Sequence, residues 1–145
     1  MDWLIKMDFL LVALMLMFIS WRDITTRMIS HKNLLLLTVA LVPLFIVEKK
    51  FPNFISACWV FVVCFILFTL HIIGGGDVKL LTLLSLPFSS SALTAFLLTT
   101  AFWGGVIALF GLIFFNRNVR LHGVPYGLAI SLAFISIYPI TVAPY

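Results

Sequence analysis

Residues 80–115 read LLTLLSLPFSSSALTAFLLTTAFWGGVIALFGLIFF, a stretch without a single charge. Counted from Val78, one continuous helix would be about 57 Å long at about 1.5 Å per residue. A bilayer core is about 30 Å thick, so the stretch is too long for one crossing. Pro87 and the serines after it offer a turn near the middle. We therefore predict two helices, near residues 78–88 and 92–115.

Similar apolar runs surround this stretch, and together they exclude a soluble protein. The chain is 63% hydrophobic and 10% charged, whereas soluble domains carry roughly 25% charged residues. A small domain cannot bury so much apolar surface, and a barrel would need alternating polarity. The other runs are Phe9 to Trp21 with an extension from Trp3, Leu34 to Val47, Phe54 to Ile73, and Val124 to Val142. We predict an all-α integral membrane protein, a bundle of about six transmembrane helices forming a single domain over residues 1–145.

The positive charges indicate how these helices are oriented. The chain has nine Lys and Arg residues and a net charge of +4, but they are scattered between apolar runs, so we expect no nucleic acid partner. With six crossings, connections 1, 3 and 5 lie on one side, and the positive-inside rule makes that side cytoplasmic. Both termini then lie outside. The basic residues of these connections are Arg22, Arg27, Lys32, Lys79, Arg117 and Arg120.

Two of the five acidic residues stand apart from the others. Asp2, Asp8 and Glu48 fall on the outer side and are interpreted as solvated surface residues. Asp23 and Asp77 each adjoin an apolar helix, and two crossings separate them, so both belong to the same membrane face. Carboxylates at membrane margins are costly and tend to mark function.

Two carboxyl groups brought close together supply the chemistry of peptide hydrolysis. They cannot both ionise easily, so the pair shares a proton. The ionised member takes a proton from water, while the protonated member polarises the scissile carbonyl and later protonates the leaving amine. Asp23 and Asp77 are therefore the predicted catalytic pair. No metal or cofactor is predicted, and Cys58 and Cys64 are interpreted as small hydrophobic residues.

Three glycines, Gly74, Gly75 and Gly76, directly precede Asp77. Glycines let an extended substrate backbone approach the carboxylate, and they permit unusual dihedral angles at a helix junction. The alternative is a simple helix break and cap. Phosphate binding is not expected, because no Lys-Ser/Thr pair follows as in a P-loop. We predict that these three glycines contact substrate.

Three segments resemble the prepilin peptidases, a family of membrane aspartyl proteases. Residues 74–81 (GGGDVKLL) resemble the family's GxGD segment, and Asp23 with residues 26–29 (TRMI) resembles its first-aspartate segment. Residues 124–129 (VPYGLA) are similar to a Pro-Tyr/Phe-Gly element that opens the family's last helix. The three matches come in the family's order and cover nearly the whole chain. Ser30 and His31 depart from the pattern, since Pro-Asn is usual at those positions.

The resemblance implies a function and a location. The expected reaction is removal of the short basic leader from type IV (Flp-type) prepilins or pseudopilins, at the cytoplasmic face of the bacterial inner membrane. Pro125 and Tyr126 are expected to line the substrate cleft. Larger family members carry an N-terminal region with CxxC pairs, associated with N-methylation. This chain resembles the short forms linked to Tad/Flp-type pili, so methylation is not expected.

Other functions remain open at this point. A small proton-coupled carrier or channel subunit would use Asp23 and Asp77 as proton sites, and would place them near the bilayer midplane within an internal repeat. A structural membrane subunit would tolerate Asn at both positions. A signal-peptide-peptidase-like enzyme shares GxGD but lacks the Asp23 segment.

Overall fold

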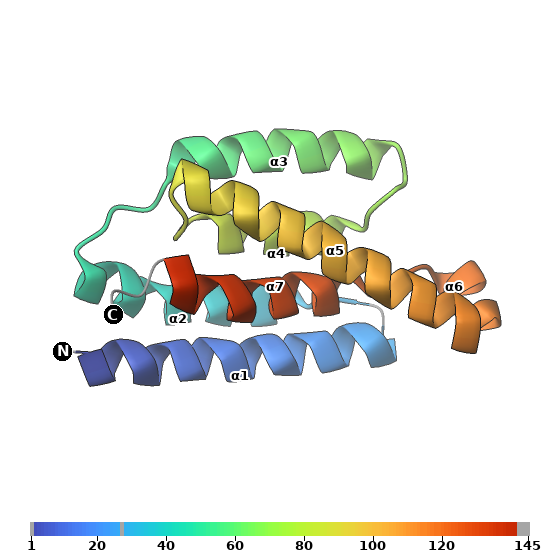
Figure 1. The fold of residues 1–145 in the computed structure, drawn as a ribbon, viewed down its shortest axis with the longest axis horizontal. Helices are drawn as coiled ribbons and strands as arrows, with labels where there is room; N and C mark the ends of the chain where they lie inside the picture. Colours follow the sequence, from blue (N-terminus) through green and yellow to red (C-terminus); the bar gives the residue numbers. More distant parts are fainter. Residues whose placement is uncertain (1, 27, 142–145) are drawn as a thin grey trace.

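A computed structural model describes residues 2–26 and 28–141, which form seven helices and no strand (Figure 1). This confirms the all-α prediction for the described part of the chain; Arg27 and Val142 lie outside it. The helices are α1 (Asp2–Thr26), α2 (His31–Glu48), α3 (Phe54–Thr69), α4 (Gly75–Ser85), α5 (Ser90–Phe114), α6 (Asn116–His122) and α7 (Tyr126–Thr141). The predicted turn near Pro87 is present between α4 and α5.

The long helices run back and forth along one axis, so the connections gather at the two ends of the bundle (Figure 1). Residues 28–30, the 70–74 connection and α6 lie at one end, while the N-terminal end of α1 and the C-terminal end of α7 lie at the other. Helix α7 is central, because it packs against α1, α4 and α5. Helix α3 packs mainly against α4 at the edge of the bundle.

Within the described part of the chain, three helices are long and apolar enough to cross a membrane: Trp3–Thr26 of α1, His31–Glu48 and Ser90–Phe114. Helices α3 and α7 are shorter apolar helices of 16 residues each. Helix α4 has 11 residues, which is about 16 Å and so about half of a bilayer core. It contacts α2, α3 and α7, so it lies inside the bundle.

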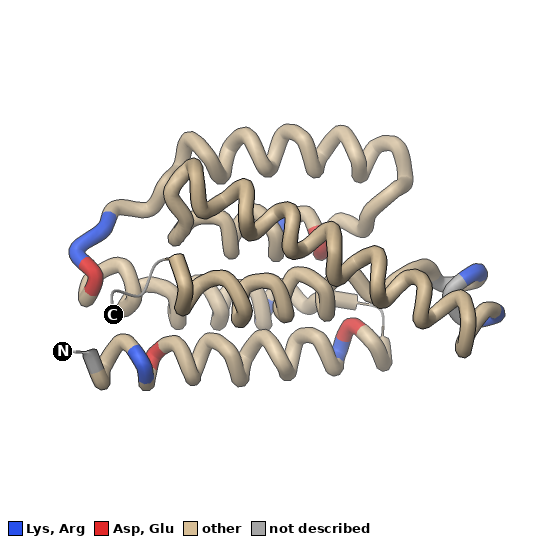
Figure 2. Tube along the Cα trace, in the orientation of Figure 1, with Lys and Arg blue, Asp and Glu red and all other residues tan. Residues whose placement is uncertain are grey.

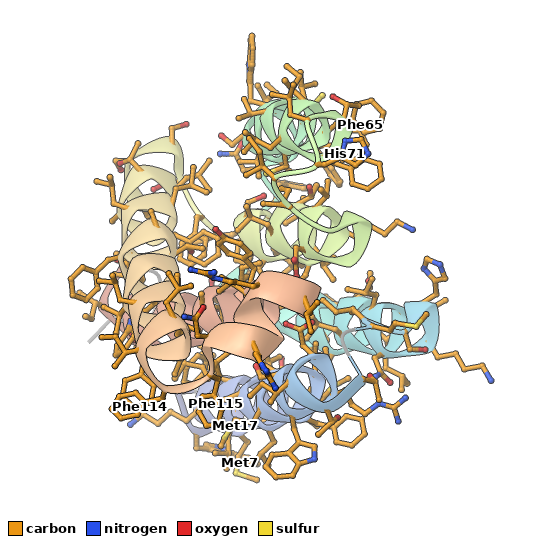
Figure 3. The ribbon with its side chains drawn as sticks, turned by 90° about the vertical axis from the view of Figure 1, so that its right-hand side faces the viewer. Met7, Met17, Phe65, His71, Phe114 and Phe115 are labelled. Atoms are coloured by element: carbon orange, nitrogen blue, oxygen red, sulfur yellow. The ribbon has the colours of Figure 1, made fainter. Side chains whose placement is uncertain are left out.

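Many large apolar side chains lie on the outer surface. Met7, Met17, Phe114 and Phe115 lie on the outside in the view along the bundle (Figure 3), and each is well over half exposed. Soluble monomers rarely expose such large contiguous apolar patches, so this surface suits lipid. The core is aromatic, with the Phe88 ring 4.8 Å from that of Phe96 and the Phe134 ring 5.1 Å from that of Tyr138.

Several boundaries differ from the sequence prediction; α3, for example, ends at Thr69 and not at Ile73. Helix α1 continues past Trp21 to Thr26, because the Thr26 hydroxyl donates to the Arg22 carbonyl, 2.7 Å away, within the last turn. Helix α4 begins at Gly75, so two of the three glycines are helical. Residues 116–122, expected as a polar connection, form the short helix α6.

Candidate active site

Asp23 lies in the last turns of α1 and is held there by a helix distant in sequence. The backbone N–H of Gly127 donates to Asp23 Oδ2 at 2.9 Å, and the Asp23 side chain is buried, with the residue 6% exposed. Gly127 belongs to the first turn of α7. First-turn N–H groups have no partner within their own helix, and the helix dipole favours negative charge there. The packing of α7 against α1 thus supplies a backbone hydrogen-bond donor for the Asp23 carboxyl.

Asp77 lies in the first turn of α4, and its own helix holds it. Gly74 is the N-cap residue, with extended backbone at φ −78° and ψ 153°. Its backbone N–H donates to the Asp77 carboxyl. Asp77 is the third residue of α4, the position from which an acidic side chain can reach back to the N–H of the cap residue. A Cβ on Gly74 would lie 3.4 Å from Asp77 Oδ2, an ordinary contact distance.

The two carboxyl groups line the same cavity, which has a volume of about 560 Å³. Both lie at the same end of the bundle, as Figure 2 shows by the acidic positions on α1 and α4. Burial, followed by the charge of Asp23, raises the pKa of Asp77 to about 7. Two carboxyls at one cavity, one of them with a raised pKa, suit general acid–base chemistry.

The three glycines make room at this cavity, and all three line it. A Cβ on Gly76 would lie 3.0 Å from the Cβ of Ile29, and one on Gly75 would lie 3.4 Å from Cε2 of Phe68. None of the three has a positive φ, so none uses the backbone freedom that glycine permits. Gly75 and Gly76 let α4 pack closely against Phe68 and Ile29.

An apolar wall forms much of the rest of the cavity. It comes from one face of α3 and from the segment that leads into α2, and its residues are Met28, Ile29, Leu34, Phe61, Phe65 and Phe68. In the view along the bundle, Phe65 and His71 both appear on the side of the molecule where α3 lies (Figure 3). A second cavity of about 400 Å³ shares Leu34 with the first and continues along α2 and α4 past Val39 and Leu83.

Two basic side chains stand where the cavities adjoin. Lys79 Nζ lies 3.4 Å from His31 Nδ1, and both residues are exposed and line both cavities. His31 is the first residue of α2. No cluster of three His, Cys, Asp or Glu residues suited to a metal ion occurs among the residues described.

The Pro125–Tyr126 pair stands apart from the other predicted site residues. Neither residue is among those that line the described cavity. Tyr126 instead contacts α5, because a Cβ on Gly104 would lie 3.2 Å from its Cε1. The residue that reaches an aspartate is the next one, Gly127, which sequence reasoning missed. Its place in the Pro-Tyr-Gly element was the available signal.

Comparison with known families agrees with this site. A model described as the type IV leader peptidase family matches residues 10–109, more than half of the chain. The matched part contains Asp23, Asp77 and all three glycines. No curated protein and no solved structure matches the chain. The chain therefore belongs to the type IV leader peptidase family, a family of peptidases.

Proposed function

We propose that this protein is an aspartyl endopeptidase that removes the basic leader peptide from Flp-type prepilins or pseudopilins, with Asp23 and Asp77 as its catalytic pair. The observation that carries the proposal is that these two carboxyls, from helices α1 and α4, line one cavity at one end of an apolar bundle. Family membership indicates a leader peptidase. The proposal that it is an aspartyl protease rests on the two carboxyls that line the cavity.

The reaction uses one ionised and one protonated carboxyl. The carboxylate takes a proton from water, whose oxygen attacks the scissile carbonyl carbon while the carboxylic acid polarises the carbonyl oxygen. The tetrahedral intermediate collapses, the C–N bond breaks, and the carboxylic acid protonates the leaving nitrogen. One water is consumed, and transfer of the first proton between the two carboxyls restores the pair.

The apolar wall supports a substrate that is itself apolar beside the cleaved bond. Phe61, Phe65 and Phe68 form one side of the cavity, and the second cavity extends the groove along α2 and α4. An apolar helix of the substrate would lie along this groove while its N-terminal leader reaches the aspartates. Gly74, Gly75 and Gly76 leave space for the substrate backbone next to Asp77.

The charge distribution supports a cytoplasmic location for the aspartates. Basic residues collect at the aspartate end of the bundle (Figure 2), while Lys6 and Lys49 at the other end are accompanied by Asp8 and Glu48. By the positive-inside rule this end faces the cytoplasm. We propose one multi-pass domain of about six membrane helices, residues 1–145, in the bacterial inner membrane. The position of Asp23 in the last turns of α1 favours a peptidase over a proton carrier with mid-membrane carboxylates.

The test is co-expression with an Flp-type pilin precursor, followed by gel analysis of leader removal. Asp23→Asn and Asp77→Asn should each abolish the size shift. Asp8→Asn is the matched control, because it makes the same chemical change on α1 at the opposite end of the bundle. Processing by either aspartate variant would refute the catalytic pair. Failure of the wild-type chain on the precursor would refute the substrate.

A further inference from the structure

The two aspartates receive their backbone hydrogen bonds from different sources. Asp77 accepts from Gly74, the cap of its own helix. Asp23 accepts from Gly127, 104 residues away in sequence and in the first turn of a different helix. The position of the Asp23 carboxyl therefore depends on how α7 packs against α1.

Gly127 has no room for any side chain. An added Cβ would lie 2.7 Å from Asp23 Oδ2, 3.1 Å from its Cγ and 3.3 Å from its Cβ. Gly127 does not have a positive φ, so its backbone would accept alanine without strain. The requirement for glycine at this position is therefore the approach of the Asp23 carboxyl to the N–H.

We propose that Gly127 is a positioning residue, whose backbone N–H holds Asp23 as the ionised general base and so makes Asp77 the general acid. This assignment rests on the proposed function. A backbone N–H at a helix N-terminus stabilises the charged form of a carboxyl. Because two adjacent carboxyls resist double ionisation, the single proton of the pair then goes to the other member.

The surroundings of Asp77 agree with its role as the acid. Burial raises the pKa of Asp77, the Asp23 charge raises it further, and the Gly74 hydrogen bond lowers it by less, leaving it at about 7. Among the described residues, the other titratable groups at this end of the packed helices are Arg22, His31, Lys32, His71, Lys79 and Tyr126, and α6 adds Arg117 and Arg120. Of these, His31 and Lys79 contact each other, and Tyr126 packs against α5.

The first test compares Gly127→Ala with Gly105→Ala. An added Cβ at Gly105 meets nothing within 4 Å, so this variant controls for the chemical change alone. We expect Gly127→Ala to lower kcat about 100-fold, since small misplacements of a catalytic group cost about this much. The acidic limb of its pH–rate profile should move to higher pH, because displaced Asp23 binds its proton more tightly, and the alkaline limb should stay. Unchanged kcat and an unchanged acidic limb would overturn the proposal.

A second measurement covers the case in which Gly127→Ala does not fold. Infrared spectra of the purified protein just below neutral pH detect protonated carboxyl groups, and differences between variants cancel the contributions of other acids. We expect the protonated band to be lost in Asp77→Asn; in Asp23→Asn it should remain but titrate at lower pH, because burial still raises the pKa of Asp77 while the charge of Asp23 is gone. The reverse pattern would overturn the assignment. No substrate is added, so the spectra test the assignment of acid and base independently of whether the protein cleaves prepilins.

Discussion

Gly76 rests directly against Ile29: a Cβ at Gly76 would lie 3.0 Å from the Cβ of Ile29. This distance is shorter than ordinary van der Waals contact, and Ile29 is β-branched and stiff. The contact joins the first turn of α4 to the segment between α1 and α2. It therefore sets how closely Asp77, the next residue, approaches the helix that carries Asp23.

We expect Gly76→Ala to lower kcat/KM about tenfold, because the new methyl group would push the first turn of α4 away from Ile29. Gly75→Ala is the matched comparison, since its Cβ would lie at an ordinary 3.4 Å from the Phe68 ring. Its loss should be smaller. Cleavage kinetics with a purified pilin precursor measure both, and equal losses would contradict this account of the contact.

The raised pKa of Asp77 predicts a pH dependence. Below a pKa of about 7 the carboxyl holds its proton and can act as an acid; above it the proton is lost. We expect the cleavage rate to fall as pH rises through about 7, approaching tenfold for each further unit. Thermal unfolding in detergent over the same pH range would separate this effect from loss of folded protein. A flat rate up to pH about 9 would contradict it.

The sequence was sufficient to predict the apolar helices. It was also sufficient to predict that Asp23 and Asp77, separated by two crossings, lie at one end of the bundle. Both follow from local properties, namely the length of apolar runs and the breaks between them. The division into two helices near Pro87 is an example, because Pro87 and the serines that favour the turn are adjacent in sequence.

The sequence was insufficient for contacts between distant helices. The hydrogen bond from Gly127 to Asp23 depends on the packing of α7 against α1, and no local pattern encodes it. The same is true of Lys79 and His31, whose nitrogens meet across α4 and α2. The extension of α1 to Thr26 was missed because its last residues are polar and were interpreted as a connection. In the structure the Thr26 hydroxyl donates to the Arg22 carbonyl of the same helix.

The apolar wall predicts a defect in substrate binding. Phe65 lines the cavity with its ring centroid 5.9 Å from that of Phe61. Phe65→Ala should raise KM about tenfold with little change in kcat, because burying such a side chain against substrate is worth about 1.5–3 kcal/mol. Phe110→Ala is the control: Phe110 is an exposed residue of α5 with a similar ring neighbour, Phe114. Equal KM values in the two variants would exclude this wall from the substrate site.

At the opposite end of the bundle, a buried polar pair predicts a loss of stability without loss of chemistry. The Tyr138 hydroxyl donates to Glu48 Oε1 at 2.5 Å, joining α7 to α2, and the Glu48 side chain is 5% exposed. Tyr138→Phe removes this donor from a buried carboxyl, which costs about 1–3 kcal/mol. Glu48→Gln should cost less, because the amide oxygen still accepts from Tyr138. Thermal unfolding in detergent should rank wild type above Glu48→Gln above Tyr138→Phe, with kcat per folded molecule unchanged. A reduced kcat in folded Tyr138→Phe would instead tie this pair to the aspartate site.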